Sequence, residues 1–149
     1  MDSNLEIRQI KQEEREDALR LVQDVFMKFE VAEYDEEGVQ HFLTFIHDEE
    51  QTMALEMYGA FIGGTVIGVL AMRKQGTHVS LFFVDEAYHR QGIGRVLFEY
   101  MLRTNNQKKI TVNAAPYALK IYEKLGFVAT DMEKTEDGIR YTPMKYIGK

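Results

Sequence analysis

The sequence has 149 residues, 45% of them hydrophobic and 28% charged, and its 24 acidic against 18 basic side chains give a net charge of -6. These values are typical of one globular domain, which we expect to span residues 1–149, and they exclude fibrous and disordered chains. The chain has no cysteine, which excludes disulfide scaffolds, thiolate metal sites and a cysteine nucleophile, and its acidic balance argues against a nucleic-acid partner.

The first 50 residues are predicted to form a short strand and two amphipathic helices. They carry neither the basic nor the apolar segment of a signal peptide, so we expect a cytoplasmic protein. The strand covers residues 5–10. Apolar residues recur at helical spacing on one face of each helix; they are Ala18, Val22, Val25, Phe26 and Phe29 in the first, and Val39, Phe42, Leu43 and Ile46 in the second.

Residues 57–72 form the longest uncharged run, whose 16 residues are fewer than the roughly 20 that a membrane-spanning helix needs. No membrane partner is therefore expected. The run contains Gly63-Gly64 between two apolar stretches that are rich in β-branched residues. Because glycine accepts the positive φ angles of tight turns, we predict a β-hairpin of strands 54–62 and 65–72.

The second half is predicted to contain four further strands and two helices. The elements are strands 77–84 and 109–113, helices 92–103 and 118–125, and a final hairpin of 127–133 with 139–146. Gly126 is expected to end the second helix, and Asp137-Gly138 to turn the hairpin. The edge of this hairpin could pair with a second copy and give a homodimer.

The resulting order is β-α-α-β-β-β-α-β-α-β-β, which predicts an α/β (α+β) fold. Residues 77–113 form a strand–helix–strand unit, which is expected to be a right-handed parallel crossover. The hairpins on either side are antiparallel. We therefore expect a mixed, mostly antiparallel twisted sheet with about four helices on its faces.

The turn before the helix at 92–103 has the composition of an anion site. Gly92 and Gly94 let a phosphate approach the backbone, and the free N–H groups of a helix N-terminus attract negative charge. Arg90 and Arg95 add positive charge. Leu97 occupies the third small position of a dinucleotide fingerprint, and no P-loop motif is present. On its own, this Gly-x-Gly pattern fits a purely structural turn equally well.

Two segments resemble the GCN5-related N-acetyltransferase (GNAT) family. His89-Arg90-Gln91-Gly92-Ile93-Gly94 is similar to its pyrophosphate-binding motif Q/R-x-x-G-x-G/A, with His89 at the first position. Residues 118–127, Ala-x-x-x-Tyr-Glu-Lys-Leu-Gly-Phe, are similar to the family helix that follows the fifth strand. The predicted order of elements also matches, so the resemblance covers nearly the whole chain.

The resemblance implies acetyl-CoA as the acyl donor and a primary amine of a small molecule or peptide as the acceptor. The N–H groups of residues 91–95 would hold the pyrophosphate, and the pantetheine arm would follow the third strand of the sheet. Many members carry an Asn where Ala115 stands here, and Asn113 is a candidate substitute. The cofactor-binding residues implied are Phe82, Val84, His89, Arg90, Gln91, Gly92, Ile93, Gly94, Arg95, Asn113 and Tyr122.

Tyr122 matches the family's general acid. Expulsion of the CoA thiolate is easier when an acid donates a proton, and a phenol remains protonated at neutral pH. The alternative interpretation is that Tyr122 is simply one residue of the apolar stripe of its helix.

A general base is harder to identify, because the strand before the glycine turn lacks the Glu that many members carry there. Strand alternation predicts that His78, Ser80 and Phe82 share one face, opposite Val79, Leu81 and Phe83. We expect His78 and Ser80 to belong to the catalytic set, with His78 acting directly or through water. His78 could equally be an exposed histidine at a strand end, and Glu56 is a weaker candidate.

Direct transfer in a ternary complex is favoured, because Cys is absent and neither serine lies in a nucleophile elbow. No metal is expected, since His41 and His47 are six residues apart and no H-E-x-x-H motif occurs. The acidic cluster Glu30, Glu33, Asp35, Glu36 and Glu37 is either a rim that attracts a cationic amine or a solvated loop. A non-catalytic acetyl-CoA-binding regulatory protein and a generic phospholigand-binding domain are the alternative functions.

Overall fold

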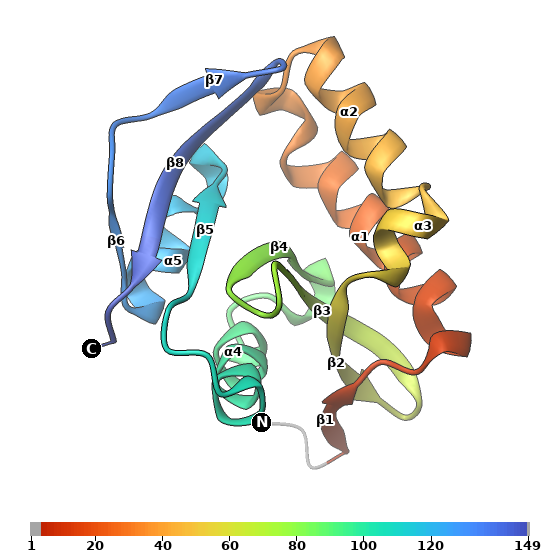
Figure 1. The fold of residues 1–149 in the computed structure, drawn as a ribbon. Helices are drawn as coiled ribbons and strands as arrows, with labels where there is room; N and C mark the ends of the chain where they lie inside the picture. The colour runs from red at the N-terminus through yellow and green to blue at the C-terminus, as the bar shows by residue number, and fades with distance from the viewer. Residues whose placement is uncertain (1–3, 149) are drawn as a thin grey trace.

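The computed structural model describes residues 4–148 as one eight-stranded sheet with helices on both faces (Figure 1). In chain order the strands and α-helices are β1 (Leu5–Gln9), α1 (Arg15–Phe29), α2 (Glu36–Ile46), α3 (Glu49–Met53), β2 (Glu56–Ile62), β3 (Thr65–Arg73), β4 (His78–Val84), α4 (Ile93–Asn105), β5 (Thr111–Ala114), α5 (Leu119–Leu125), β6 (Phe127–Ala129), β7 (Lys134–Glu136) and β8 (Ile139–Tyr146). Short 3₁₀ helices lie at Gln12–Glu14, Val31–Glu33, Glu86–Tyr88 and Pro116–Ala118.

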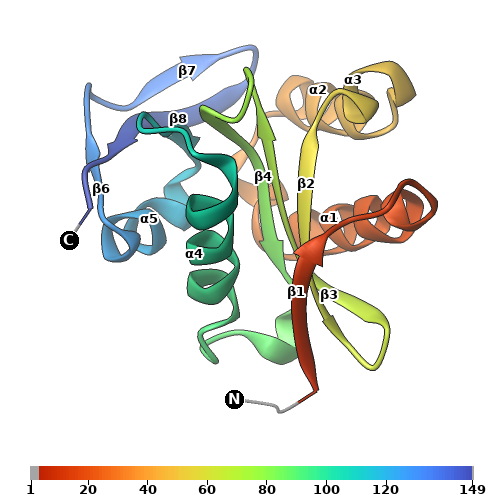
Figure 2. The same ribbon diagram turned by 60° about the horizontal axis from the view of Figure 1, so that its bottom comes forward.

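The sheet confirms the predicted fold class. Its strand order is β1-β2-β3-β4-β5-β8-β6, with β7 paired to β8. β4 and β5 are parallel and are joined through α4, whereas every other described pair is antiparallel. Figure 2 shows α4 and α5 on one side of the sheet and α1, α2 and α3 on the other.

Alternating side chains build a separate core on each face of the sheet. Along β3, Val69 and Ala71 pack with α1 and α2, and Leu70 and Met72 pack with α4. Successive side chains of a strand point to opposite faces, so a strand that is apolar throughout is covered on both sides. No helix among residues 4–148 is long and apolar enough to cross a lipid bilayer.

A β-bulge in β4 changes the predicted faces of that strand. Ala71 pairs with Leu81 and Met72 pairs with Val79, so that Ser80 is an extra residue without a partner on β3. Val79 consequently packs on the α4 side together with Phe82, while Leu81 packs on the α1 side. The prediction that His78 shares a face with Phe82, opposite Val79, is therefore wrong, whereas the position of Phe82 opposite Leu81 and Phe83 is confirmed.

The parallel strands β4 and β5 pair only at their beginning. The paired residues are His78 with Thr111 and Val79 with Val112, and the two strands separate beyond these positions (Figure 1). This separation agrees with the predicted splaying of their carboxyl ends. The backbone of the later part of β4 is therefore not covered by β5, and ligands of open α/β sheets bind at such places.

Two local features differ from the prediction. The first strand of the final hairpin is split into β6 and β7, because the four residues 130–133 lie opposite only two residues of β8, 142–143. A fifth helix, α3, begins after Asp48, whose side chain accepts a hydrogen bond from the N–H of Gln51. The expected turns at residues 63–64 and 137–138 are confirmed, with positive φ at all four positions.

Candidate functional site

The glycine turn leaves three backbone N–H groups free at the start of α4. Gly92 is the N-cap with φ 80°, a conformation that strains other residues. The first N–H with an acceptor one turn back is that of Val96, 3.1 Å from the Gly92 oxygen. Within residues 4–148, the N–H groups of Ile93, Gly94 and Arg95 donate to no other group. With the positive end of the helix dipole, they fit an anion such as a pyrophosphate.

Gly94 keeps the surface open between this turn and Tyr122. A Cβ built on Gly94 would lie 3.6 Å from the ring of Phe82, so any side chain here would cover that ring. The Phe82 ring in turn lies 6.0 Å from that of Tyr122, edge to face. The structure thus brings Gly94, Phe82 and Tyr122 together in one line.

The side chains of the turn contribute unequally. The Arg95 guanidinium donates to the carbonyl of Lys124 at the end of α5, 3.0 Å away. The amide of Gln91 donates to the carbonyl of Ala87 at 3.2 Å. Arg90 is exposed, and its side chain makes no hydrogen bond or ion pair with a described residue. Of these three polar side chains, Arg90 is the one most available to an anion.

His89 and Asn113 lie apart from the row of free N–H groups. The His89 Nε2 atom is 2.6 Å from the carbonyl oxygen of Val84, and its ring packs on Phe29. Val84 itself is half-buried at the end of β4. Asn113 is exposed on the face of β5 opposite Ala114, which packs in the Tyr122 core. The structure therefore does not bring Asn113 to Phe82 and Tyr122.

Tyr122 is a buried phenol at the end of the line from Gly94. Its ring contacts Phe82 and Phe127, with centroids 6.0 and 5.3 Å away. Burial, followed by the negative charge of Glu30, raises the pKa of Tyr122 well above 10. The phenol is thus fully protonated at neutral pH and can donate a proton to a leaving group.

His78 is buried at the first position of β4, where β4 pairs with β5. It is 6% exposed, so it is not the exposed strand-end histidine that the sequence also allowed. Its Nδ1 atom lies 2.8 Å from Thr111 Oγ1. Burial, and then the positive charges of Arg73 and Lys74, lower the pKa of His78 to about 4. The imidazole is therefore neutral at pH 7.

Glu30 differs from the other acidic residues of its cluster, which the acidic pattern of the sequence does not reveal. This residue caps the carboxyl end of α1 and is only 8% exposed. Burial, and then the nearby charge of Glu33, raise its pKa to about 7. A signal was available, because Glu30 follows Val22 and Phe26 at intervals of four and so continues the buried stripe of the helix.

Glu30 lies where the end of α1 meets the chain that follows β5. There the Glu33 carboxylate accepts a hydrogen bond of 3.0 Å from the N–H of Tyr117. The rings of Phe29 and Tyr117 are stacked, with centroids 5.6 Å apart. The charge of Glu30 raises the pKa of Tyr117 as well as that of Tyr122. Glu30 therefore belongs to the same neighbourhood as the buried phenol.

The burial of Glu30 leads to a prediction about stability. The folded state favours the protonated acid up to about pH 7, whereas the carboxyl of the unfolded chain loses its proton near pH 4.5. The contribution of Glu30 to the unfolding free energy should therefore fall as the pH rises through this window. Glu30→Gln removes the penalty, so its stability relative to wild type should rise from near zero at pH 4 to about 3 kcal/mol at pH 8.

Urea unfolding of both proteins at pH 4, 6 and 8 measures this difference. Glu36→Gln is the control for the loss of one carboxylate, because Glu36 is exposed and its substitution should change the stability far less than Glu30→Gln does at pH 8. A flat profile for Glu30→Gln would show that the carboxyl is well hydrated in the folded protein.

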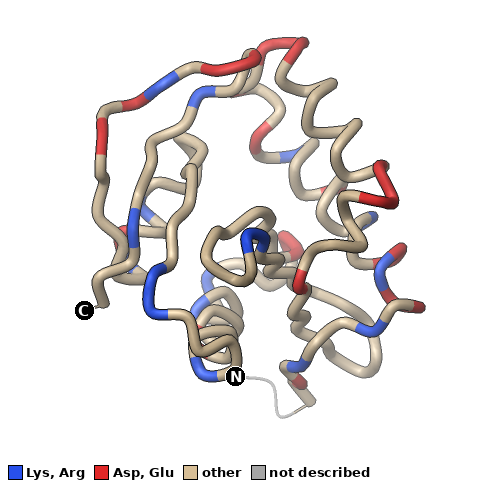
Figure 3. Tube along the Cα trace, viewed as in Figure 1, with Lys and Arg blue, Asp and Glu red and all other residues tan. Residues whose placement is uncertain are grey.

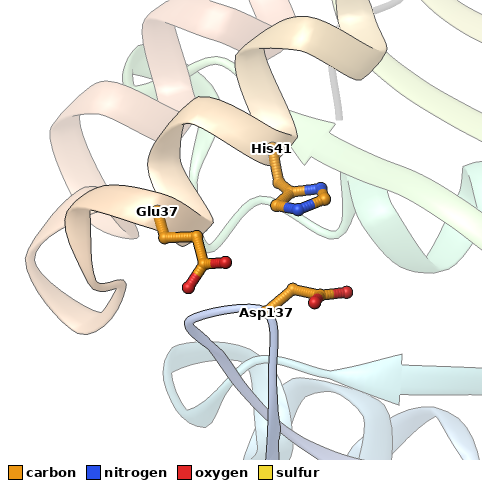
Figure 4. Close-up of side chains that lie close together, drawn as sticks. All are labelled: Glu37, His41 and Asp137. Carbon is orange, nitrogen blue, oxygen red and sulfur yellow. The ribbon is translucent and has the colours of Figure 1, made fainter.

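The acidic residues gather on the side of the sheet that carries α1, α2 and α3 (Figure 3). Glu37 and His41 of α2 lie close to Asp137 in the turn between β7 and β8 (Figure 4). One possible ligand atom from each of the three falls within 4.8 Å of the others, but all three side chains are exposed. Nothing else about this group indicates an ion, and the expected absence of a metal stays a prediction.

Comparison with known proteins agrees with this geometry. The family model described as an acetyltransferase (GNAT) domain matches residues 30–147. No curated protein matches the chain.

Solved structures share the fold over almost the whole chain. A GCN5-related N-acetyltransferase from Rhodopseudomonas palustris superposes with a TM-score of 0.81 at 18% identity, covering 98% of this chain and 97% of its own. The PaiA N-acetyltransferase from Thermoplasma acidophilum, in complex with coenzyme A, gives 0.72 at 18% identity over 98% and 99%. Ard1 from Thermoplasma volcanium gives 0.64 at 20% identity over 98% and 99%.

Proposed function

Because this chain belongs to the GCN5-related N-acetyltransferase family, we propose that it transfers an acetyl group from acetyl-CoA directly to a primary amine of a small molecule or a peptide. One observation carries the proposal: three free N–H groups at the start of α4 are followed by the open ring of Phe82 and then by the buried, protonated Tyr122. An anion site, an apolar ring and a proton donor thus lie next to one another in turn, Gly94 beside Phe82 and Phe82 beside Tyr122.

This line of groups suits a long ligand with an anionic end and an apolar arm. The N–H groups of Ile93, Gly94 and Arg95 would hold the pyrophosphate of acetyl-CoA, with Arg90 adding charge. The pantetheine arm would pass over Phe82 toward Tyr122. When bound, acetyl-CoA supplies an activated thioester.

Direct transfer is the mechanism that these residues support. The chain has no cysteine to form an acyl-enzyme. The part of β4 beyond Val79 is paired with β3 but not with β5, so the N–H groups on its edge facing β5 are available to polarise the thioester carbonyl. Tyr122 would protonate the departing thiolate. A buried phenol of this kind favours a catalytic protein over a regulator that only binds acetyl-CoA.

A two-part experiment tests the proposed function. Acetyl-CoA should raise the melting temperature of the protein, because a ligand that binds only the folded state stabilises it. The protein should then release free thiol from acetyl-CoA in the presence of some members of an amine panel comprising cadaverine, phenethylamine and a tripeptide with a free N-terminus. Absence of both the thermal shift and thiol release would refute the acetyltransferase assignment.

A further inference from the structure

Glu30 is a buried acid that no other described group neutralises. Its side chain is more than nine-tenths buried and makes no hydrogen bond or ion pair with a residue in 4–148. A carboxylate in such a place is unfavourable unless it is paired. No unbonded side-chain oxygen among the described residues is sealed from solvent, so a ligand can reach the Glu30 carboxylate and supply the missing partner.

Glu30 lies near the place where the sheet separates into two parts, the strands up to β4 and the strands from β5 onward. α1 packs on the side that carries β3 and β4, and Tyr117 and Tyr122 belong to the chain that follows β5. The hydrogen bond from Tyr117 N to Glu33, and the stack of Phe29 on Tyr117, join these parts next to Glu30. Glu30 thus lies where these two parts of the chain meet, within electrostatic reach of Tyr122.

The titratable groups that interact electrostatically with Glu30 are one acid and three tyrosines. Tyr34, Tyr117 and Tyr122 all experience its charge, and Glu33 is the charged group that acts on Glu30 itself. Arg90 acts on Tyr117 but does not shift the pKa of Glu30. An acid surrounded by aromatic rings and lacking a cation of its own suits a ligand cation.

The surroundings of His78 have the opposite charge. Arg73 and Lys74 are the charged groups that act on His78, and both disfavour a second cation at that position. An alkylammonium would thus be repelled from His78 and attracted to Glu30. Of the two candidate proton acceptors, the charges therefore favour Glu30 over His78.

Building on the proposed function, we propose that Glu30 is a catalytic residue whose carboxylate binds the ammonium group of the acceptor and removes its proton. The acceptor class is a primary amine that is protonated in solution, with its carbon chain lying against the rings of Phe29 and Tyr117.

The proton balance assigns each transfer. The ammonium nitrogen loses two protons in becoming an amide, and Glu30 accepts them in turn. The first passes to solvent and frees the amine lone pair, which forms the N–C bond to the thioester carbon. The C–S bond then breaks, and the thiolate takes the phenolic proton of Tyr122. The second proton from nitrogen passes through Glu30 to restore Tyr122, so that the products are amide, thiol and one released proton.

Glu30→Gln tests the role of the carboxylate with little change of shape. With an amine that the wild type acetylates, kcat/KM should fall about 10²- to 10⁴-fold, the contribution of a general base. The wild-type pH profile of kcat/KM should show an acidic limb near pH 7, because only the carboxylate accepts a proton. This limb should be absent from Glu30→Gln. The Kd for acetyl-CoA should be unchanged.

Two further variants separate catalysis from structure. Glu33→Gln removes the like charge that raises the pKa of Glu30, so the acidic limb should move to lower pH. Glu13→Gln, at an exposed position before α1 and outside the acidic cluster, should have the wild-type rate and profile. A Glu30→Gln variant that keeps the wild-type rate or the acidic limb would overturn the assignment and leave the proposed function standing.

Amine binding decides the inference even without turnover. Calorimetry would measure the binding of cadaverine and of phenethylamine to the complex with CoA, for the wild type and for Glu30→Gln. We expect the wild type to bind at least one amine and Glu30→Gln to bind it at least tenfold more weakly, about 1.4 kcal/mol. Equal binding, or no binding by the wild type, would refute the role of Glu30. Failure of acetyl-CoA itself to bind would instead refute the proposed function.

Discussion

Tyr122→Phe is expected to lower kcat about 10²- to 10⁴-fold while the Kd for acetyl-CoA stays close to that of the wild type. The substitution removes only the phenolic hydroxyl, so the leaving thiolate must take its proton from water. The ring of Phe would keep the edge contacts with Phe82 and Phe127. Steady-state thiol release gives kcat, and calorimetry gives the Kd.

Tyr100→Phe is the matched control for this prediction. Tyr100 lies on α4 with its ring against Tyr58, 6.0 Å between centroids, and takes no part in the proposed line of groups. Its loss of a hydroxyl should leave kcat unchanged. If Tyr122→Phe also kept the wild-type kcat with every amine tested, Tyr122 would be a packing residue and not the acid.

Gly94→Asp should raise the Kd for acetyl-CoA about 100-fold or more, because a carboxylate facing a pyrophosphate costs several kcal/mol. The new side chain would also cover the Phe82 ring, 3.6 Å from its Cβ. The same change should not weaken the fold. That contact distance is an ordinary one, and an acid in the first turn of a helix is favourable.

Gly94→Asn separates charge from size in this experiment. It has nearly the volume of Asp without the charge, so its Kd should lie between those of the wild type and Gly94→Asp. Melting temperatures without ligand check that all three proteins are folded. Equal Kd values for the three would mean that acetyl-CoA does not bind at the start of α4.

The two buried titratable groups have opposite effects on stability in acid. As the pH falls from 7 to 4.5, Glu30 gains a proton that the folded state prefers, which stabilises the protein. As the pH falls from 6.5 to 4, His78 resists a proton that the unfolded chain accepts, which destabilises it. The wild-type stability should thus change little between pH 4.5 and 6.5, and removing either group should expose the contribution of the other.

Most of the fold could be predicted from the sequence because its signals are local. The spacing of Val22 and Phe26 marks a helix face, and Gly63-Gly64 marks a turn whatever the rest of the chain does. The bulge at Ser80 could not be predicted, since it arises from the register of β4 against β3. One extra residue there reverses the faces of Val79 and His78.

The candidate site could be predicted only where backbone geometry defines it. Gly92 and Gly94 act through φ and through the absence of a side chain, both of which can be read from the residue type. The positions of the Arg95 and His89 side chains depend on hydrogen-bond partners elsewhere in the chain. Arg95 bonds the carbonyl of Lys124, and His89 bonds that of Val84. Glu30 was obscured by its acidic neighbours, because sequence alone does not distinguish a buried carboxyl from the exposed ones beside it.

Product analysis by mass spectrometry tests the central claim most directly. The wild-type protein would be incubated with acetyl-CoA and an amine that stimulates thiol release. The masses of the amine, the thiol and the intact protein would then be measured. Direct transfer predicts one acetylated amine for each thiol released and no acetyl group on the protein. Thiol released without acetylated amine, or an acetyl group retained on the protein and then passed to the amine, would contradict it.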